Sequence, residues 1–272
     1  MADVEKYLRA HTLPHIWCPG CGHGTVLGAV VRAVDRAGLP HDKVVVVSGI
    51  GCAARGAGYL DFDTLHTTHG RAIPFATGIK VANPDLHLII LTGDGDAAAI
   101  GGNHLIHACR RNIDMTVVVF NNNIYGMTSG QYSPQTPQNG VATTAPYGNI
   151  ERSFDLCSLT REAGATFVAR GTAYGAVALS RYIEQGFKNK GFSFIEAISQ
   201  CPTYYGRRNR FANPVKMLEW QRDNSVSVAK AAKLEPAELR DKIITGVMHQ
   251  SQEPEYTDLY KEIIAVASKR GS

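Results

Sequence analysis

Short runs rich in β-branched residues alternate along this chain with longer segments that repeat apolar side chains every three or four residues. The strand-like runs are Val44–Ser48, Leu86–Thr92, Met115–Asn121, Thr166–Ala169 and Ser193–Ser199. The helix-like segments are Gly24–Ala37, Ile73–Val81, Ala97–Arg111, Leu156–Ala163 and Tyr174–Asn189. Near-continuous apolar strands are typical of parallel sheets that are covered on both faces. The alternation predicts an α/β fold with a mostly parallel, doubly wound sheet, in which ligands bind at the carboxyl ends of the strands.

The last quarter of the chain differs in composition from the rest. From about Cys201 glycine becomes scarce, charged helical segments are expected to the end, and Arg207, Arg208 and Arg210 cluster. We predict one α/β domain over residues 1–200 and a C-terminal extension over 201–272 that packs on a partner subunit or on the flank of the domain. A solvated face is the favoured interpretation of the arginine cluster, and contact with an acidic partner is the alternative.

Composition excludes several classes of protein. The 272 residues, 44% of them hydrophobic, can bury an ordinary core, and a net charge of +4 is too small for a nucleic-acid-binding surface. No apolar run approaches the length of a membrane helix, and residues 1–17 resemble neither a signal peptide nor a transit peptide, so we expect a cytoplasmic protein. In that reducing compartment, the 6 cysteines are expected to bind metal or take part in chemistry rather than form disulfides.

The first strand is followed by a glycine-rich loop, Ser48–Ala54, that fits the dinucleotide fingerprint with alanine in the third place. That fingerprint requires a helix directly after the loop and then a strand carrying an acid that binds ribose. The stretch Arg55–His69 is instead rich in Gly, Asp and His and shows no helical periodicity. A nicotinamide cofactor is therefore disfavoured, although the loop still brings backbone N–H groups near a ligand.

Two polar motifs follow the second and third strands. They are Thr92–Asp96, which reads Thr-Gly-Asp-Gly-Asp, and Phe120–Gly126, which contains three consecutive asparagines. One helix and one return strand fill the interval 96–120, so both motifs are expected at the same edge of adjacent parallel strands. Carboxylate and amide oxygens suit Mg²⁺, and a helix beginning near Ala97 turns its positive end toward an anion.

Each of these motifs also has a simpler structural interpretation. Taken separately, Asp94 would be a helix cap and Asn121–Asn123 a turn. Their joint occurrence at this spacing favours a site that binds a diphosphate together with a metal ion.

The cysteines divide by position. Trp17-Cys18-Pro19-Gly20-Cys21 resembles a thioredoxin motif, but no strand precedes it, and no second close Cys or His pair follows it as a structural zinc site would require. Cys52 lies on the first glycine loop, and Cys201 follows the last strand. The thiolates of Cys18, Cys21, Cys52 and Cys201 could therefore surround an iron–sulfur cluster close to the expected diphosphate site. The other two lie within helical segments and are interpreted as small buried hydrophobic residues: Cys109 and Cys157.

The Gly-Asp-Gly motif and the later Asn-Asn pair together resemble the thiamine diphosphate motif of thiamine-dependent enzymes. The resemblance implies that Asp94 and Asn122 bind Mg²⁺ through their side chains and Ile124 through its backbone carbonyl. It also implies that Gly95 and Asp96 lie on the diphosphate.

The combination of these motifs, from about Tyr7 to Asn209, resembles the β subunit of the 2-oxoacid:ferredoxin oxidoreductases. The strings that carry it are LPHIWCPGCGHG, GIGCAARG, HTTHGRA, GDGDAAAIGGNH, NNNIYGMTSGQYSPQT and CPTYYGRRN. The resemblance implies thiamine diphosphate, Mg²⁺ and one 4Fe-4S cluster. The residues expected to line the cofactor, besides Gly95 and Asp96, are Ile50, Gly51, Cys52, Ala53, His69 and Met127. For His69, an ordinary loop residue is the alternative.

The resemblance also implies an α subunit that completes the active site and supplies the activating glutamate, so no catalytic residue is assigned in this chain. The expected complex is a heterodimer or a dimer of heterodimers. The expected reaction is the oxidative decarboxylation of 2-oxoglutarate with coenzyme A to succinyl-CoA and CO₂, with electrons passing through the cluster to ferredoxin and the reaction open to reversal. Pyruvate or a branched-chain 2-oxoacid is the alternative substrate.

Two further hypotheses concern the recognition of the substrate and the functional class of the protein. Arg55 could pair with the distal carboxylate of 2-oxoglutarate. An exposed loop arginine or a contact to a coenzyme A phosphate is an equally good interpretation of this residue. In the alternative of another class, the chain is a non-catalytic module that holds cofactors and transfers electrons.

Overall fold

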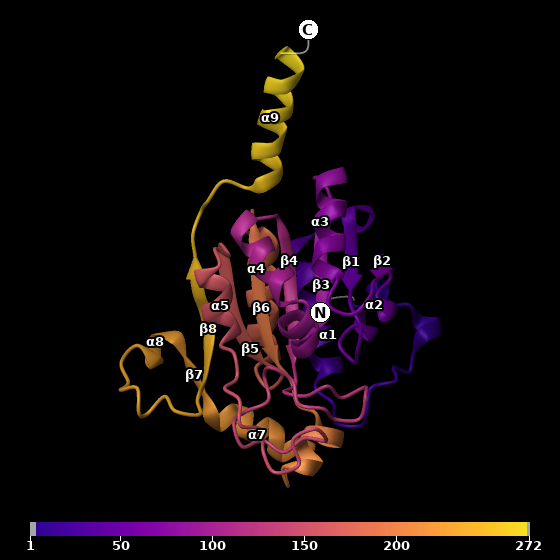
Figure 1. The fold of residues 1–272 in the computed structure, drawn as a ribbon. Helices are drawn as coiled ribbons and strands as arrows, with labels where there is room; N and C mark the ends of the chain where they lie inside the picture. Colours follow the sequence, from indigo (N-terminus) through magenta and orange to yellow (C-terminus); the bar gives the residue numbers. More distant parts are fainter. Residues whose placement is uncertain (1–3, 271–272) are drawn as a thin grey trace.

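The computed structural model describes residues 4–270, which form one central sheet with helices on both faces (Figure 1). The strands of the sheet are β1 (Val44–Ser48), β2 (Asp63–His66), β3 (His87–Gly93), β4 (Met115–Asn121), β5 (Phe167–Thr172), β6 (Phe192–Ile198), β7 (Ser225–Ser227) and β8 (Ile243–Gln250). Their spatial order is β2-β1-β3-β4-β6-β5-β8-β7. Every strand pair is parallel except β5 with β8, so the predicted mostly parallel α/β fold is confirmed.

The helices follow the strands in the alternation that the sequence predicts. The α-helices are α1 (His23–Ala37), α2 (Arg55–Tyr59), α3 (Ala72–Ala82), α4 (Gly102–Arg111), α5 (Leu156–Glu162), α6 (Ala176–Lys188), α7 (Pro214–Asn224), α8 (Val228–Ala231) and α9 (Tyr256–Arg270). Short 3₁₀ turns lie at Glu5–Tyr7, Ala10–Thr12 and His41–Lys43, and π-helical turns at Asp96–Ile100 and Pro202–Gly206. Within residues 4–270, no helix combines the length and the apolar character that crossing a membrane requires.

Two apolar cores sandwich the sheet. On one face α1 and α6 pack together and bury Val30, Val34 and Ile183 against alternate strand residues such as Val118. On the other face α3, α4 and α5 bury Leu105 and their other apolar side chains against the intervening strand residues. Because β3, β4 and β6 are covered on both faces, nearly all their side chains are buried, which explains their continuous apolar sequence.

The structure corrects the sequence-based interpretation at the first glycine loop. The stretch Arg55–His69, for which no regular structure is predicted, holds the short helix α2 and the edge strand β2. The acid of β2 is Asp63 at its amino end, whereas ligands bind at carboxyl ends. At the carboxyl end of β2, His66 Nδ1 instead lies 2.8 Å from Ser48 Oγ. The dinucleotide interpretation therefore stays disfavoured.

The predicted helix Ala97–Arg111 is also divided. It consists of a π-helical turn, Asp96–Ile100, and then α4, with Gly101 between them. A side chain at Gly101 would place its Cβ 2.4 Å from the carbonyl oxygen of Asp96. The backbone thus passes too closely here for any residue but glycine.

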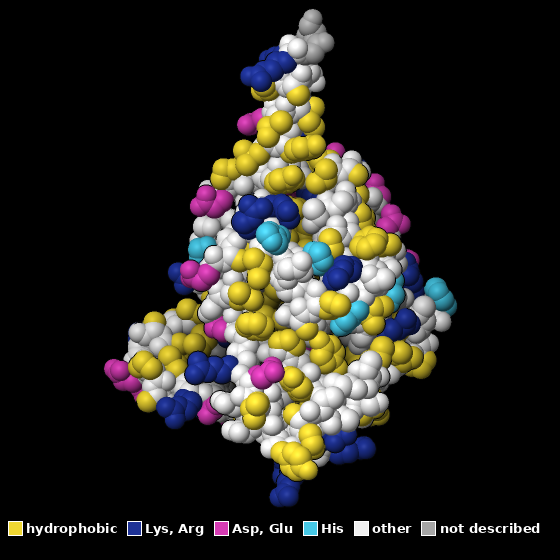
Figure 2. Space-filling view, in the orientation of Figure 1, with side chains coloured by type: hydrophobic (Ala, Val, Ile, Leu, Met, Phe, Trp, Pro, Cys, Tyr) yellow, Lys and Arg dark blue, Asp and Glu magenta, His cyan; other side chains and the backbone are white. Residues whose placement is uncertain are grey.

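The C-terminal part is less purely helical than its composition suggests. Besides α7, α8 and α9 it contributes β8, which pairs antiparallel with β5 and so extends the central sheet. After β8 the chain continues into α9, which projects beyond the amino ends of the parallel strands (Figure 1). Figure 2 shows apolar side chains along this projecting helix. The exposed apolar residues of α9 include Leu259, Ile263 and Val266. The expected boundary at residue 200 and the packing of this part on a partner stay predictions.

Candidate functional site

Several loops leave the carboxyl edge of the sheet at one level. The strand register sets Gly93 of β3 beside Phe120 of β4, and Phe120 beside Ala197 of β6. The segments that follow these strands carry Asp94, the asparagine run and Cys201, in that order. The predicted convergence of these motifs at one edge is therefore what the register produces.

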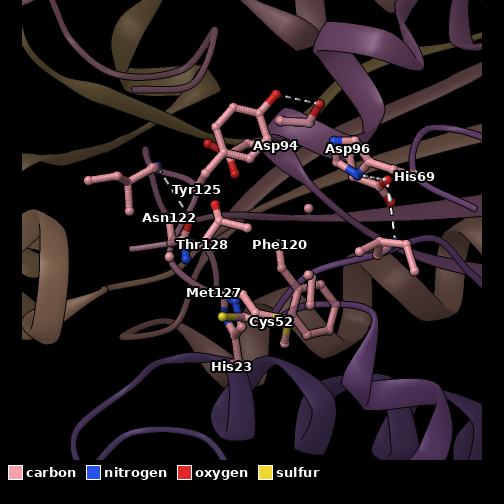
Figure 3. A pocket seen from close by; sticks show the side chains of 17 residues that line it. His23, Cys52, His69, Asp94, Asp96, Phe120, Asn122, Tyr125, Met127 and Thr128 are labelled. Carbon is pink, nitrogen blue, oxygen red and sulfur yellow. Dashed lines mark hydrogen bonds and ion pairs between the residues drawn. The ribbon is translucent and has the colours of Figure 1, made fainter. Parts of the chain in front are cut away.

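A cavity of about 290 Å³ opens between these loops (Figure 3). Its wall contains all eight residues expected to line the cofactor and all three expected to bind Mg²⁺. The full lining is His23, Ile50, Gly51, Cys52, Ala53, His69, Gly93, Asp94, Gly95, Asp96, Phe120, Asn122, Ile124, Tyr125, Gly126, Met127 and Thr128. The structure thus brings the predicted residues together, while the role of each in binding stays a prediction.

Asp94 is a buried carboxylate without a cationic partner among the residues described. Its side chain is 3% exposed, and Oδ2 accepts a hydrogen bond of 2.5 Å from Ser133 Oγ. Burial raises the pKa of this carboxyl to about 7, and the hydrogen bond from Ser133 opposes that rise. A cation in the cavity would stabilise the charged form. The group therefore fits a metal ligand.

Asp96 is engaged by the neighbouring loops. Oδ1 accepts hydrogen bonds from the backbone N–H of Gly70 (2.6 Å) and of Ile50 (3.4 Å), and Oδ2 accepts one from Thr92 Oγ1 (2.7 Å). His69 Nδ1 lies 2.8 Å from Oδ1 (Figure 3). This carboxylate holds the two loops that form one side of the cavity, and its expected place on the diphosphate stays a prediction.

Two glycines allow close approaches around the cavity. A Cβ at Gly49 would lie 1.9 Å from Asp96 Oδ2, and a Cβ at Gly95 would lie 2.2 Å from the ring of Tyr125. The hydroxyl of Tyr125 also donates a hydrogen bond of 3.2 Å to the carbonyl oxygen of Gly95. Side chains at either glycine would therefore displace the walls of the cavity.

The asparagine run is held from beneath by a buried ion pair. Asn121 Nδ2 donates a hydrogen bond of 2.7 Å to Glu196 Oε1, and Arg170 Nε lies 2.6 Å from Glu196 Oε2. Glu196 is 1% exposed, so its end of the ion pair is shielded from water. Asn123 has a left-handed backbone with φ 62°. Because these contacts fix the run on either side, Asn122 is held in the cavity wall.

The cysteine-bearing segments are tied to one another by hydrogen bonds. Trp17 Nε1 donates to the carbonyl oxygen of Cys52 (2.8 Å), and the N–H of Gly22 donates to the carbonyl oxygen of Gln200 (3.1 Å). His23 Nδ1 lies 2.9 Å from Ser199 Oγ. These contacts join the Cys18–Cys21 segment to the Cys52 loop and to the segment before Cys201.

The four cysteines expected to bind a cluster lie close together. A Cβ at Gly126 would be 3.6 Å from Cys52 Sγ and 3.8 Å from Cys201 Sγ. Burial raises the pKa of Cys21 to about 12 and that of Cys52 to about 11, and the neighbouring thiols raise both further. All six cysteines are free, and Cys109 and Cys157 are buried in helices as predicted. The four thiols thus come from three segments and face one region beside the cavity.

This arrangement does not form the site of a single metal ion. Within residues 4–270, no group of three or more His, Cys, Asp or Glu side chains is arranged to hold one ion. In a 4Fe-4S cluster each thiolate binds a different iron, so the sulfurs surround a cube and not a point. Backbone N–H groups of Tyr205, Tyr204 and Thr203 point at the Cys201 thiol and oppose the rise of its pKa by burial. These donors favour a thiolate, so the residues fit the cluster.

Two candidates lie outside the cavity. Arg55 is exposed on the first turn of α2, where its guanidinium carbon lies 6.0 Å from the centre of the Tyr59 ring. Arg207, Arg208 and Arg210 are exposed after the π-helical turn that follows Cys201. The structure does not bring Arg55 to the cofactor pocket, and its pairing with a substrate carboxylate stays a prediction.

Sequence reasoning missed several residues that shape the site. A charge at Glu196 within an apolar strand was the available signal for the buried pair with Arg170. His23 lies two residues after Cys21 and lines the cavity, where burial lowers its pKa to about 4. Ser133 lies in a loop without periodicity, and nothing in the sequence marks its contact with Asp94.

Comparison with known proteins agrees with this geometry. Residues 49–197 match the family described as thiamine pyrophosphate enzyme, C-terminal TPP binding domain. This span begins at the first glycine loop and ends in β6, so it includes both polar motifs of the cavity. The fold and the cavity therefore define a thiamine diphosphate-binding domain.

Relatives narrow the class. The chain is 54% identical to the 2-oxoglutarate synthase subunit KorB of Methanothermobacter marburgensis, over 93% of this chain and 89% of that protein. It is 51% identical to the subunit of the same name in Methanocaldococcus jannaschii, over 97% of this chain and 98% of that protein.

A solved structure is similar as well. It is the 2-oxoglutarate:ferredoxin oxidoreductase from Magnetococcus marinus with 2-oxoglutarate, coenzyme A and succinyl-CoA bound. It matches with a TM-score of 0.87 at 33% identity, over 97% of this chain and 90% of that one. The chain belongs to the β subunits of the 2-oxoacid:ferredoxin oxidoreductases, within the 2-oxoglutarate type.

Proposed function

We propose that this chain binds thiamine diphosphate, Mg²⁺ and a 4Fe-4S cluster, and that with an α subunit it converts 2-oxoglutarate and coenzyme A to succinyl-CoA and CO₂ while reducing ferredoxin. The observation that carries the proposal is the cavity itself. Its wall joins Asp94 and Asn122, which suit a metal–diphosphate group, to Cys52, which belongs to the cysteine cluster. The relatives' names and the ligands of the similar solved structure support 2-oxoglutarate and coenzyme A as substrates.

The charge of the cavity supports a divalent cation. No Lys or Arg is among the described residues that line it, and burial keeps His23 neutral at physiological pH. A diphosphate in this cavity would therefore depend on a metal ion for most of its charge compensation. Asp94, Asn122 and the carbonyl of Ile124 would supply three oxygen ligands, and the diphosphate and water would complete the shell.

When bound, thiamine diphosphate would supply the nucleophilic carbon and the electron-accepting ring that decarboxylation of a 2-oxoacid requires. This chain supplies placement. Gly51, with φ 113°, allows the first loop to turn beside the cavity, and no atom lies within 4 Å of the position of a Cβ there. Cys52 on the same loop lines the cavity and would hold the cluster beside the cofactor.

The cavity also indicates a partner subunit. No glutamate lines it within residues 4–270, so the acid that activates the cofactor would come from another chain. Ile50 and Met127 line the cavity and are 39% and 47% exposed, which leaves apolar surface for a partner to cover. Its volume of about 290 Å³ lies just below the usual range for ligand pockets, as expected if the chain holds one part of the cofactor.

The free cysteines support a reducing location. All six are unpaired, and a cluster-bearing complex that reduces ferredoxin would be placed in the cytoplasm. The complex would be a heterodimer or a dimer of heterodimers, and the reaction would run in either direction according to the redox state of ferredoxin.

The test is anaerobic co-expression of the chain with its α subunit, followed by turnover with a panel of 2-oxoacids, coenzyme A and ferredoxin. We expect activity with 2-oxoglutarate and little with pyruvate, and no turnover by the isolated chain. Preference for pyruvate would overturn the substrate. A complex that exchanges electrons with ferredoxin but turns over no 2-oxoacid would support the non-catalytic module instead.

The cluster has its own readout. Wild-type protein should be brown, Cys201→Ser should lose the visible absorbance, and the matched control Cys109→Ser should keep it because Cys109 lies in α4 away from the cavity. A colourless wild type that contains zinc would contradict the cluster.

A further inference from the structure

The connection between β4 and α5, residues 122–155, contains no helix or strand, yet part of it is deeply buried. Long connections of this kind usually carry function. The buried part is the tetrad Ser133–Thr136, in which Ser133 is 1%, Gln135 5% and Thr136 0% exposed. Buried polar side chains must find hydrogen-bond partners, so their contacts show what the tetrad holds in place.

One end of the tetrad holds Asp94. Ser133 Oγ donates a hydrogen bond of 2.5 Å to Asp94 Oδ2 and accepts one of 3.2 Å from the N–H of Gln135. The hydroxyl is thus fixed in orientation. Asp94 Oδ1 accepts no side-chain hydrogen bond from residues 4–270, and Asp94 lines the cavity. Backbone N–H groups of Gly95 and of Asp94 itself also interact with the carboxylate, so Oδ1 is the oxygen that no described side chain engages.

The other end of the tetrad holds the asparagine run. Thr136 Oγ1 donates a hydrogen bond of 2.6 Å to the carbonyl oxygen of Asn123 and accepts one of 2.9 Å from the N–H of Ser133. Gln135 Oε1 accepts a hydrogen bond of 3.2 Å from Asn121 Nδ2. The tetrad therefore connects the two motifs that converge on the proposed metal site.

We propose that Ser133 is a positioning residue that makes Asp94 a one-oxygen ligand and so gives the site a preference for Mg²⁺ over Ca²⁺. Mg²⁺ requires a compact octahedron of oxygens at about 2.0–2.1 Å, whereas Ca²⁺ accepts longer bonds, more ligands and carboxylates bound through both oxygens. The hydrogen bond from Ser133 favours the one-oxygen mode, because a cation bound through both oxygens would compete with the hydroxyl for Oδ2. The inference rests on the proposed binding of thiamine diphosphate with a metal ion.

The test compares metal preference and not activity. In the αβ complex, the dissociation constant of thiamine diphosphate is measured by equilibrium dialysis with Mg²⁺ or Ca²⁺ as the only divalent cation. Wild type should bind more tightly with Mg²⁺. The preference for Mg²⁺ is the dissociation constant with Ca²⁺ divided by that with Mg²⁺. Ser133→Ala should reduce this ratio by about tenfold, since a hydrogen bond to a charged group is removed. Ser133→Thr, which keeps the hydroxyl, should restore the ratio.

Thr136→Val is the matched control. It removes a hydroxyl of the same tetrad that contacts Asn123 and not Asp94, so it should weaken binding equally with both metals. An unchanged ratio in Ser133→Ala, or an equal change of ratio in Thr136→Val, would overturn the proposal. Failure of wild-type protein to bind thiamine diphosphate with either metal would instead overturn the proposed function. Melting temperatures of the variants show whether each is folded.

Discussion

The two edges of the sheet use buried polar side chains in different ways. At the amino edge, Asn112 Oδ1 accepts hydrogen bonds from the N–H of Phe192 (2.8 Å) and from Thr166 Oγ1 (3.0 Å), and its Nδ2 donates to the carbonyls of Glu253 and Pro254. At the carboxyl edge, Asp94 carries a single side-chain hydrogen bond.

This difference separates a structural role from a binding role. The polar atoms of Asn112 are all satisfied by the chain itself, so this residue contributes to stability. Asp94 is just as buried and lines the cavity, but its Oδ1 has no side-chain partner within residues 4–270, and burial raises its pKa to about 7. A buried acid that the fold leaves incompletely satisfied is costly unless a ligand completes it, and such groups concentrate at functional sites.

Asp94→Asn should show the largest effect on binding. We expect thiamine diphosphate to bind at least about a hundredfold more weakly, because a charged metal ligand becomes neutral. The melting temperature without cofactor should stay the same or rise, since a buried charge is removed. Equilibrium dialysis measures the binding of thiamine diphosphate, and thermal denaturation measures the melting temperature. A clear loss of stability with binding intact would reverse the assignment of this edge to binding.

Asn112→Ala should show the opposite pattern. It leaves the N–H of Phe192 and the hydroxyl of Thr166 without this partner, and it places alanine at φ 50°. The free energy of unfolding, measured with urea, should fall by about 2 kcal/mol, while the dissociation constant of thiamine diphosphate changes less than about twofold. Asn112→Gly keeps the backbone conformation and isolates the lost hydrogen bonds. Weakened cofactor binding in either variant would contradict a purely structural role.

Much of the fold could be predicted because burial on both faces leaves a plain record in the sequence. The strands Val44–Ser48 and Met115–Asn121 have the predicted bounds. The strand β2 could not be found this way, because it is an edge strand whose Asp63 and His66 are exposed. The strand β8 could not be predicted for a similar reason, since seven of its residues are only half-buried.

The residues of the site also divide into those that the sequence could predict and those that it could not. Asp94 and Asn122 directly follow buried strands, so the sheet itself brings them together, and their convergence follows from the order of elements. Ser133 reaches Asp94 from a connection whose path no periodicity describes. Glu196 and Arg170 meet because β5 and β6 are neighbours, which requires the strand order and not only the strands.

The smallest effect is expected in α9, which starts at the amino edge and projects from it. Tyr256 in its first turn packs against the apolar core of one sheet face, and Glu255 accepts hydrogen bonds from the N–H groups of Asp114 (3.1 Å) and Thr257 (2.8 Å). Ile263, in contrast, is 63% exposed. Ile263→Ser should therefore change the free energy of unfolding of the isolated chain by less than about 0.5 kcal/mol.

Glu255→Ala is the matched comparison for that prediction. It should cost about 1–2 kcal/mol and speed amide hydrogen exchange throughout α9, because the N–H of Asp114 and the first turn of the helix lose their acceptor. Hydrogen exchange and urea unfolding measure both variants. If Ile263→Ser destabilises the isolated chain as much as Glu255→Ala does, the part of α9 beyond Tyr256 is also held by apolar packing on the body.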